Sequence, residues 1–244
     1  MKVLVIGDSC RDIFVYGTCQ RLCPAAPVPV FEPLFTRENL GMAGNVYQNL
    51  VSLGMPCTFI SNAANVEKKR MVEEKTNHML LRIDTGENNI QRVKDISMDL
   101  LKEHTAVVVS DYNKGFLEEE DIRFICQNHD LVFIDTKKKL GEFCKDVSYI
   151  KINEPEYEKS IDFISQSDWV NDKLIVTLGS EGCKYKEDTY SVDKVEIKDL
   201  SGAGDTFLAG LVYNYLKTSD IQESIKFANE CATKAVQKKG VVTL

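Results

Sequence analysis

Short apolar runs that alternate with helical patterns are the feature that most restricts the fold of this chain. The runs are rich in β-branched residues, and several end at a polar residue or a glycine. They occupy residues 2–7, 57–61, 106–110, 131–135, 149–153 and 174–177. Such runs are typical of strands buried within a parallel sheet. Apolar residues at helical spacing lie between several of them, so the sequence predicts a doubly wound, mostly parallel α/β sheet flanked by helices.

Two segments depart from this alternation. Residues 14–36 are rich in proline, and residues 68–84 end in the apolar stretch of residues 79–81. Both patterns favour extended segments outside the main sheet, and we expect them to form a small β lid. No repeat, low-complexity tract or linker divides the rest of the chain, so we expect one domain over residues 1–244 that carries this lid.

Charge and cysteine content exclude several classes of protein. The formal net charge is -7, whereas a general nucleic-acid binder needs a basic surface that neutralises phosphates. No apolar stretch reaches the length that a bilayer crossing requires, and Met1 and Lys2 lead directly into a strand-like run without a secretory signal. The 8 cysteines form no C-x-x-C pair. These features predict a protein of the reducing cytoplasm, with no membrane or nucleic-acid partner.

Polar residues follow the predicted strands at the point where each strand ends. They are Asp8, Asp111, Asp135, Asn153, Thr177 and Gly179. Polar residues are common in any loop, which accounts for a single position. So many carboxylates and amides at one edge are better explained by a ligand crevice, because open α/β sheets bind ligands at the carboxyl ends of their strands.

The strongest local pattern is the glycine-rich turn of residues 201–206, S-G-A-G-D-T, which opens a long amphipathic helix. Glycines let the backbone approach a ligand closely, and the free N–H groups of a first helical turn attract an anion. Asp205 lies in that turn, where a carboxylate can take a proton from an attacking hydroxyl. The alternative is that Asp205 only caps the helix. The turn matches neither a Walker A loop nor a dinucleotide fingerprint.

Residues 199–207, D-L-S-G-A-G-D-T-F, closely resemble the second signature of the ribokinase-like (PfkB) carbohydrate kinases. Residues 41–45 resemble the first signature of that family, and residues 153–156 resemble its N-x-x-E motif. Residues 177–182 are similar to its nucleotide loop, T-x-G-x-x-G. The four motifs occur in the family's order, and the resemblance covers nearly the whole chain. It implies a ribokinase-like fold and an ATP- and Mg-dependent kinase.

The resemblance also implies a role for each matching residue. Asp205 would be the general base, and the N–H groups of Gly202, Ala203 and Gly204 would hold the transferring phosphoryl group. Asn153 and Glu156 would help place Mg. The nucleotide site would be lined by Thr177, Gly179 and Gly182, with Asn229 near the adenine. Sugar hydroxyls would be bound by Asp12, Gly41 and Asn45.

Within the family, one branch is the most similar. Residues 7–12, 16–17, 21–30, 80–84 and 110–115 resemble the kinases that act on D-glycero-D-manno-heptose 7-phosphate. This implies the anomeric hydroxyl of that sugar as acceptor, with Asp111 among the substrate residues of the matching segments. The sugar phosphate would need a cation, and the candidates are Lys68, Arg70, Arg82 and Lys137. The sequence does not choose among them, and each is equally readable as a plain surface charge.

Three features depart from the family pattern. Met42 stands where the first signature usually has a glycine, Ala25 stands where the heptose branch usually has a glutamate, and the stretch from Ser61 to Lys68 lacks the usual helix and strand. They keep two alternatives open: a kinase for another sugar, sugar phosphate or nucleoside, and a non-catalytic sugar or nucleotide sensor. A homodimer also stays open, since the shortened stretch bears on any dimer made through the lid.

Overall fold

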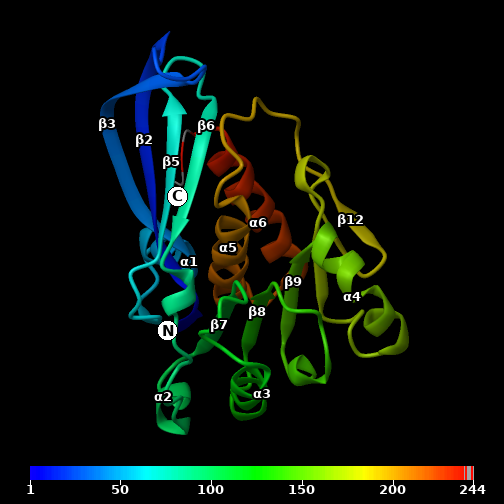
Figure 1. The fold of residues 1–244 in the computed structure, drawn as a ribbon. Coiled ribbons are helices and arrows are strands. Elements are labelled where there is room, and N and C mark those ends of the chain that lie inside the picture. Colours follow the sequence, from blue (N-terminus) through cyan, green and yellow to red (C-terminus); the bar gives the residue numbers. More distant parts are fainter. Residues whose placement is uncertain (239, 241–242, 244) are drawn as a thin grey trace.

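An eight-stranded sheet forms the centre of the computed structural model, which describes residues 1–238, 240 and 243 (Figure 1). Its strands are β1 (Val3–Gly7), β4 (Cys57–Ser61), β7 (Ala106–Asp111), β8 (Val132–Thr136), β9 (Tyr149–Asn153), β10 (Leu174–Thr177), β11 (Cys183–Tyr185) and β12 (Asp188–Tyr190). They are ordered β12-β11-β10-β9-β8-β7-β1-β4. The six strands predicted as apolar runs are the parallel ones, and the β11–β12 hairpin adds an antiparallel edge.

Helices cover both faces of this sheet (Figure 1). They are α1 (Ala43–Ser52), α2 (Met98–Lys102), α3 (Glu119–Asn128), α4 (Glu154–Gln166), α5 (Ala203–Thr218) and α6 (Ile221–Val236), with 3₁₀ turns at Glu87–Asn89, Glu142–Cys144 and Gly179–Glu181. One apolar cluster joins the sheet to α2, α3 and α4, and a second joins it to α1, α5 and α6. Strand β1 contributes alternate side chains to the two clusters, which explains why its residues are apolar throughout.

A second, four-stranded sheet stands beside the body of the protein and is coloured blue to cyan in Figure 1. Its strands are β2 (Ser9–Leu22), β3 (Pro29–Met42), β5 (Glu67–Glu73) and β6 (Met79–Thr85), in the order β3-β2-β5-β6. The segments expected to form a lid lie in this sheet, and its strands extend further toward the body than expected. We call this sheet the lid and the rest the body. The lid's own buried cluster is small: Phe14, Tyr16 and Val72.

The chain passes between body and lid through short connections. Only Asp8 separates β1 from β2, and α1 begins directly after β3. Residues 62–66 join β4 to β5, so β4 is the edge strand where the family pattern would place a further helix and strand. The side chain of Asn62 ties this junction together, because it accepts from the N–H of Ser9 (2.7 Å) and donates to the Ser9 carbonyl (3.1 Å).

The described part of the chain contains no helix that combines the length and the apolar character needed to cross a bilayer. This agrees with the absence of long apolar stretches in the sequence.

Candidate active site

The carboxyl ends of the parallel strands open into a cavity of about 410 Å³. Strands β8, β9 and β10 contribute Asp135, Lys151 and Thr177, and the start of α5 closes the other side. The cavity is also lined by Tyr112, Lys137, Asn153, Gly179, Gly182, Gly202, Ala203, Gly204, Asp205 and Asn229. The structure therefore brings together most of the phosphate, base, metal and nucleotide residues predicted from the sequence.

The glycine-rich turn presents the first N–H groups of α5 to this cavity. Gly202 precedes the helix with φ 80°, a left-handed conformation that suits glycine. The N–H of Ala203 points to the Leu200 carbonyl (3.3 Å), and the N–H of Thr206 is the first to bond within the helix, to Gly202 (2.9 Å). The N–H groups of Gly204 and Asp205 lie between them, in the first turn that carries the positive end of the helix dipole. This is a favourable place for a phosphoryl group.

Asp205 lies just inside the turn, and its side chain is buried, with 5% of the residue exposed. The Tyr112 hydroxyl donates to Oδ1 (2.6 Å), and the Asn45 amide donates to Oδ2 (3.1 Å). Burial raises the pKa of Asp205 to about 6, against the lowering effect of the two hydrogen bonds and of the Lys151 charge, while Asp135 adds to the rise. A carboxylate with this pKa is ionised at pH 7 and is basic enough to accept a proton.

A buried ion pair lies next to the turn. Lys151 Nζ is 2.7 Å from Asp135 Oδ2, and both side chains are almost fully buried. A Cβ atom at position 204 would lie only 2.9 Å from the same ammonium group, so the glycine there makes room for Lys151. The pair places one positive and one negative charge next to the N-terminal end of α5.

Lys137 brings a second cation into the cavity, paired with Glu156. Burial works to lower the pKa of Lys137, but Asp135 and the hydrogen bond to Glu156 outweigh it and raise the value. Glu156 also accepts from the Asn153 N–H (2.9 Å), while Asn153 Oδ1 accepts from the Glu156 N–H (3.0 Å). The N-x-x-E motif thus forms the capping box of α4.

The residues present fit a Mg²⁺ ion that keeps most of its waters. Asp135 Oδ1 is buried and finds no hydrogen-bond partner among the described residues, so it offers an unsatisfied anionic oxygen. Asn153 lines the same cavity, whereas Glu156 is not among the lining residues and is joined to Asn153 through the α4 cap. Within the described part of the chain, no group of three or more His, Cys, Asp or Glu side chains comes together as a metal site. Sparse oxygen ligands are what hydrated Mg²⁺ accepts.

A second, mainly apolar groove of about 330 Å³ adjoins the cavity. The two spaces share Gly179, Leu200, Ala203, Asn229 and Ala232, and the groove adds Val192, Val195, Ile197 and Val236. Asn229 is held by the Tyr190 carbonyl, to which its amide donates at 2.9 Å. A flat apolar ring bound in this groove would have its attached phosphates in the cavity.

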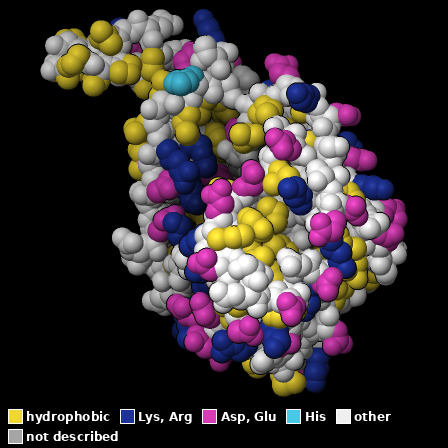
Figure 2. Space-filling view, turned by 90° about the vertical axis from the view of Figure 1, so that its right-hand side faces the viewer, with side chains coloured by type: hydrophobic (Ala, Val, Ile, Leu, Met, Phe, Trp, Pro, Cys, Tyr) yellow, Lys and Arg dark blue, Asp and Glu magenta, His cyan; other side chains and the backbone are white. Residues whose placement is uncertain are grey.

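The predicted sugar residues lie where the lid meets the body. Asp12 is buried and pairs with Arg70, and a Cβ atom at position 41 would lie 2.1 Å from Asp12 Oδ2. Asn45 donates to Asp205, so its amide contributes to holding the base. Figure 2 shows the molecule hollowed between lid and body, with Lys and Arg side chains gathered beside the hollow.

Met42 and Lys68 lie beside these residues, at the end of the lid that adjoins the body. Met42 has φ 60° and ψ -134°, a backbone conformation that favours glycine, and its side chain is buried. Lys68 Nζ lies 3.2 Å from Met42 Sδ, and the carboxylate that it approaches in the described residues, that of Glu87, is 3.9 Å away. Lys68 is thus a buried cation whose charge is only weakly compensated by the distant Glu87 carboxylate.

Two predicted substrate residues lie apart from the cavity. Asp111 is buried under Lys138, whose ammonium group is 2.9 Å from Oδ1, and it also accepts from the Thr136 hydroxyl at 2.5 Å. The oxygens of Asp111 already have donors from β8 and the loop after it, and its role as a substrate residue stays a prediction. Arg82 lies on the exposed strand β6 and makes two 2.7 Å hydrogen bonds to Asp84.

Sequence reasoning missed Tyr112 and Lys151. Tyr112 lies in the segment of residues 110–115 that resembles the heptose branch, but nothing in that segment indicated contact with a residue 93 positions away. Lys151 was detectable in principle, since a lysine in the middle of an apolar strand needs a buried partner. That partner, Asp135, had itself been noted only as a polar strand end.

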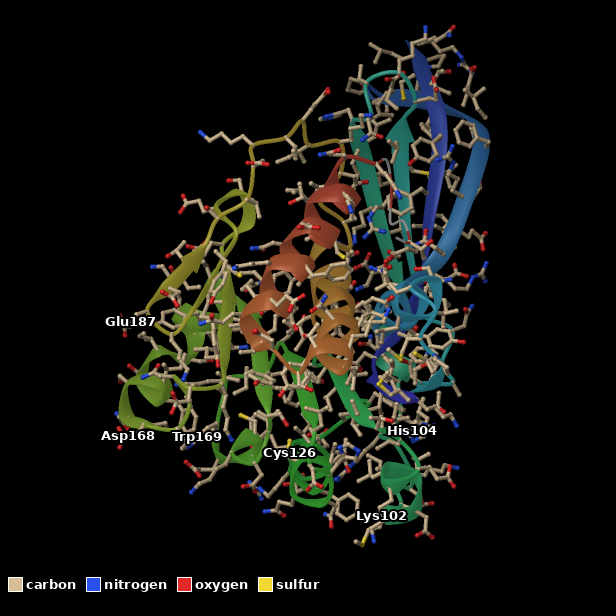
Figure 3. All side chains as sticks on the ribbon, turned by 180° about the vertical axis from the view of Figure 1, so that it is seen from behind. Lys102, His104, Cys126, Asp168, Trp169 and Glu187 are labelled. Atoms are coloured by element: carbon tan, nitrogen blue, oxygen red, sulfur yellow. The ribbon has the colours of Figure 1, made fainter. Side chains whose placement is uncertain are left out.

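The end of the sheet opposite the cavity carries different side chains. Figure 3 shows Lys102, His104 and Cys126 at the end of the molecule away from the lid. His104 contacts the Leu100 carbonyl (2.8 Å) and the Thr58 hydroxyl (2.7 Å), which ties α2 to β4. This histidine is a packing residue, and it lies far from the cavity that holds Asp205.

Comparison with known proteins identifies the family. The model of the pfkB family of carbohydrate kinases matches residues 66–244. The chain belongs to this family. The family is one of carbohydrate kinases, which are phosphotransferases with an alcohol group as acceptor, and this confirms the class predicted from the sequence.

One curated relative in the pfkB family is the bifunctional protein HldE of a Nitratiruptor species. It is 29% identical over 292 aligned positions, which take in 99% of this chain but only 63% of HldE. The chain therefore spans less than two thirds of the length of this relative. The alignment is also longer than the 244-residue chain, so the relative has residues that this chain lacks.

Solved structures confirm the ribokinase-like fold. A ribokinase from Thermotoga maritima superposes with a TM-score of 0.71 at 16% identity, covering 98% of this chain and 94% of its own. A ribokinase from Arabidopsis thaliana, complexed with ribose and ATP, gives a TM-score of 0.71 at 15% identity and covers 98% and 93%. These neighbours establish the predicted doubly wound sheet of the pfkB chain.

Proposed function

We propose that this pfkB kinase transfers the γ-phosphoryl group of ATP to a sugar hydroxyl, with Asp205 as the general base. The observation that carries the proposal is the position of Asp205: a buried carboxylate in the first turn of α5, on the wall of the cavity, beside the N–H groups of that turn. One element thus supplies both the proton acceptor and the positive end of a helix dipole.

The reaction balances with groups that the site holds. Asp205 takes the proton of the sugar hydroxyl, the hydroxyl oxygen bonds to the γ-phosphorus, and the bond from that phosphorus to the ADP oxygen breaks. Lys151 and Lys137 line the cavity where negative charge spreads over the transferring oxygens. Mg²⁺, held near Asp135, Asn153 and Glu156, would neutralise phosphate charge.

The two adjoining spaces support a nucleotide that lies across them. The apolar groove beside Asn229 suits the adenine ring, and the polar cavity with Thr177, Gly179 and Gly182 suits the phosphates. The γ-phosphate would then approach Gly204 and Asp205 at the start of α5.

The substrate we propose is D-glycero-D-manno-heptose 7-phosphate, phosphorylated at its anomeric hydroxyl. Support comes from the lid segments that resemble the heptose branch and from the match to HldE. A phosphorylated sugar also needs an available cation. Arg70, Arg82 and Lys137 each pair closely with a carboxylate, whereas Lys68 is buried and has its nearest one at 3.9 Å. Lys68 is therefore our choice among the four candidates for the substrate phosphate.

Met42 favours a related possibility, a pfkB kinase for a different sugar. Its side chain is buried beside Lys68, at a position where the first signature usually has no side chain. A narrower sugar site is the expected consequence. Fructose 6-phosphate, ribose and adenosine are the alternative acceptors that would test this possibility.

The test is an ADP-release assay with ATP and Mg²⁺ across heptose 7-phosphate, fructose 6-phosphate, ribose and adenosine, with a sugar-free reaction as control. We expect the highest kcat/KM with heptose 7-phosphate. A strong preference for an unphosphorylated acceptor would remove the heptose phosphate assignment. Ligand-dependent melting shifts without any ADP release would instead support a sensor.

The remaining predictions concern the setting of the enzyme. All eight cysteines are free thiols, which is compatible with the proposed reducing cytoplasm. A homodimer stays a prediction, and size-exclusion chromatography with light scattering would decide it.

A further inference from the structure

We propose that Tyr112 is a positioning residue for the base: its hydroxyl orients the Asp205 carboxylate so that one oxygen faces the incoming sugar. This inference rests on the proposed role of Asp205. It goes beyond that role because it assigns a function to a residue of the loop after β7 that no motif singled out.

Two donors fix the carboxylate from different parts of the chain. Tyr112 donates to Oδ1 at 2.6 Å, and Asn45, in the first turn of α1, donates to Oδ2 at 3.1 Å. An ionised carboxylate has about four acceptor positions, so each oxygen keeps one for another donor. With both oxygens held, the carboxylate cannot rotate freely, and its remaining acceptor positions keep fixed directions.

Tyr112 is itself held by a buried carboxylate at the end of β1. Asp8 Oδ2 accepts from the N–H of Tyr112 (2.8 Å) and of Lys114 (3.4 Å), and Oδ1 accepts from the N–H of Phe116 (3.3 Å). These bonds clamp the loop that follows β7. Because Asp8 directly follows the central strand β1, these bonds restrict the movement of Tyr112 and of its hydroxyl.

The ring of Tyr112 lies between the two halves of the site. Lys68, from the lid, is 5.6 Å from the ring centroid, and Lys137, from the body, is 5.4 Å from it. Burial, reinforced by the Asp205 charge, raises the pKa of Tyr112 well above its usual range. The phenol therefore stays protonated and acts as a donor throughout the working pH range.

The charged and titrating groups around Asp205 define the expected pH effect. They are Tyr112, Asp135, Lys151, Lys137 and Cys10, and the neutral amide of Asn45 adds a hydrogen bond. Hydrogen bonds to a carboxylate stabilise its charged form and lower its pKa. Loss of the Tyr112 hydroxyl removes one such bond, so the pKa of Asp205 must rise and the acid limb of activity must move to higher pH.

The experiment compares Tyr112→Phe with wild type by ADP release from pH 5 to pH 9. We expect the acid limb of kcat/KM to move to higher pH, and kcat on the alkaline plateau to fall roughly tenfold or more, because a misplaced base loses much of its orientation advantage. The KM for ATP should stay unchanged. Tyr185→Phe is the matched control: it removes a hydroxyl that bonds only the Asp172 carbonyl among the described residues, outside the site.

Two further arms separate the possible failures. If Asp205→Asn turns over like wild type, the base assignment is wrong, and the role of Tyr112 falls with it. If Asp205→Asn is inactive while Tyr112→Phe matches Tyr185→Phe in both kcat and pH profile, only the Tyr112 inference is overturned. A ring-fluorinated tyrosine at position 112 keeps the fold and donates more strongly, so it should move the acid limb to lower pH; no movement would contradict the inference.

Discussion

The body and the lid hold their charges in different ways. In the body, Asp135 and Lys151 pair with about 5% of each side chain exposed. In the lid, the Arg70–Asp12 pair next to the body is also buried, but farther out the Arg21–Glu32 pair is more than half exposed, and the Arg11–Glu38 pair nearly so. Buried charges interact strongly because the local dielectric is low, so replacing one of them costs much stability. Exposed pairs are screened by water, so replacing one of them costs little.

The departures from the family pattern follow the same division. Met42, Ala25 and the short stretch of residues 62–66 belong to the lid or to its junction with the body, while the turn at residues 201–206 and the N-x-x-E motif in the body remain. The proposed site of phosphoryl transfer thus lies where the motifs of the family are kept, and the proposed sugar site lies where the sequence departs from them. Four predictions test this contrast.

The largest effect should come from Lys151→Met, which leaves Asp135 buried without its partner. Breaking a buried ion pair costs about 3–5 kcal/mol, because the remaining charge is uncompensated. Urea unfolding measures this loss. Arg21→Met, in the exposed lid pair, should cost less than about 1 kcal/mol. The double variant Asp135→Asn/Lys151→Met should recover most of the stability; equal losses in the Lys151 and Arg21 variants would break the contrast.

Asp205→Asn should stabilise the protein at pH 8 while it abolishes turnover. The pKa of Asp205 is raised from 3.8 to about 6, so the folded state binds the proton more tightly than the unfolded state does. Stability therefore falls as pH rises from about 4 to about 6, by roughly 2–3 kcal/mol. The variant removes this cost, and its advantage should vanish below pH 4. Melting curves at pH 4 and pH 8 test this, and an equal gain at both pH values would contradict it.

Lys68→Met should weaken binding of a sugar phosphate through the lid alone. A hydrogen bond to a charged group contributes about 1.5–3 kcal/mol, so the KM for heptose 7-phosphate should rise roughly ten- to a hundredfold. The KM for ATP should not change. Arg82→Met is the control, because Arg82 is exposed and already engaged by Asp84. A larger effect from Arg82 than from Lys68 would transfer the phosphate site to β6.

The smallest effect should separate Met42→Gly from Met42→Ala. Both variants remove the buried side chain, but only glycine relieves the strain of φ 60°, which costs about 1–3 kcal/mol in a non-glycine residue. The glycine variant should therefore be the more stable one by that amount, the reverse of the usual order. If alanine is the more stable replacement, the backbone at this junction is not strained.

The main sheet was predictable because its strands are continuous apolar runs. Strands β1 and β7 are buried along their whole length, so no position had to alternate. The β11–β12 hairpin escaped prediction because each of its strands has three residues, too few for a pattern. The lid strands begin at Ser9, earlier than the predicted residue 14, because β2 leaves the body directly after β1.

The site was predictable only where one short motif carries it. The turn at residues 201–206 places Asp205 by local geometry alone, and the structure puts it on the cavity wall. The hydroxyl of Tyr112 and the amide of Asn45 reach Asp205 across 93 and 160 positions, and tertiary folding decides such contacts. The ion pair of Asp111 was not predictable for the same reason, because its partner Lys138 lies on a different loop. The roles of the individual site residues stay predictions.

The short connections at Asp8, Met42 and residues 62–66 have a mechanical consequence. The chain also returns to the body at Gly86, after β6, and any swing of the lid must pivot at these four connections. Asp8 clamps the loop of Tyr112, whose hydroxyl contacts Asp205, and Met42 touches Lys68. We therefore expect a movement of the lid at Asp8 to reach the proposed base through Tyr112 alone.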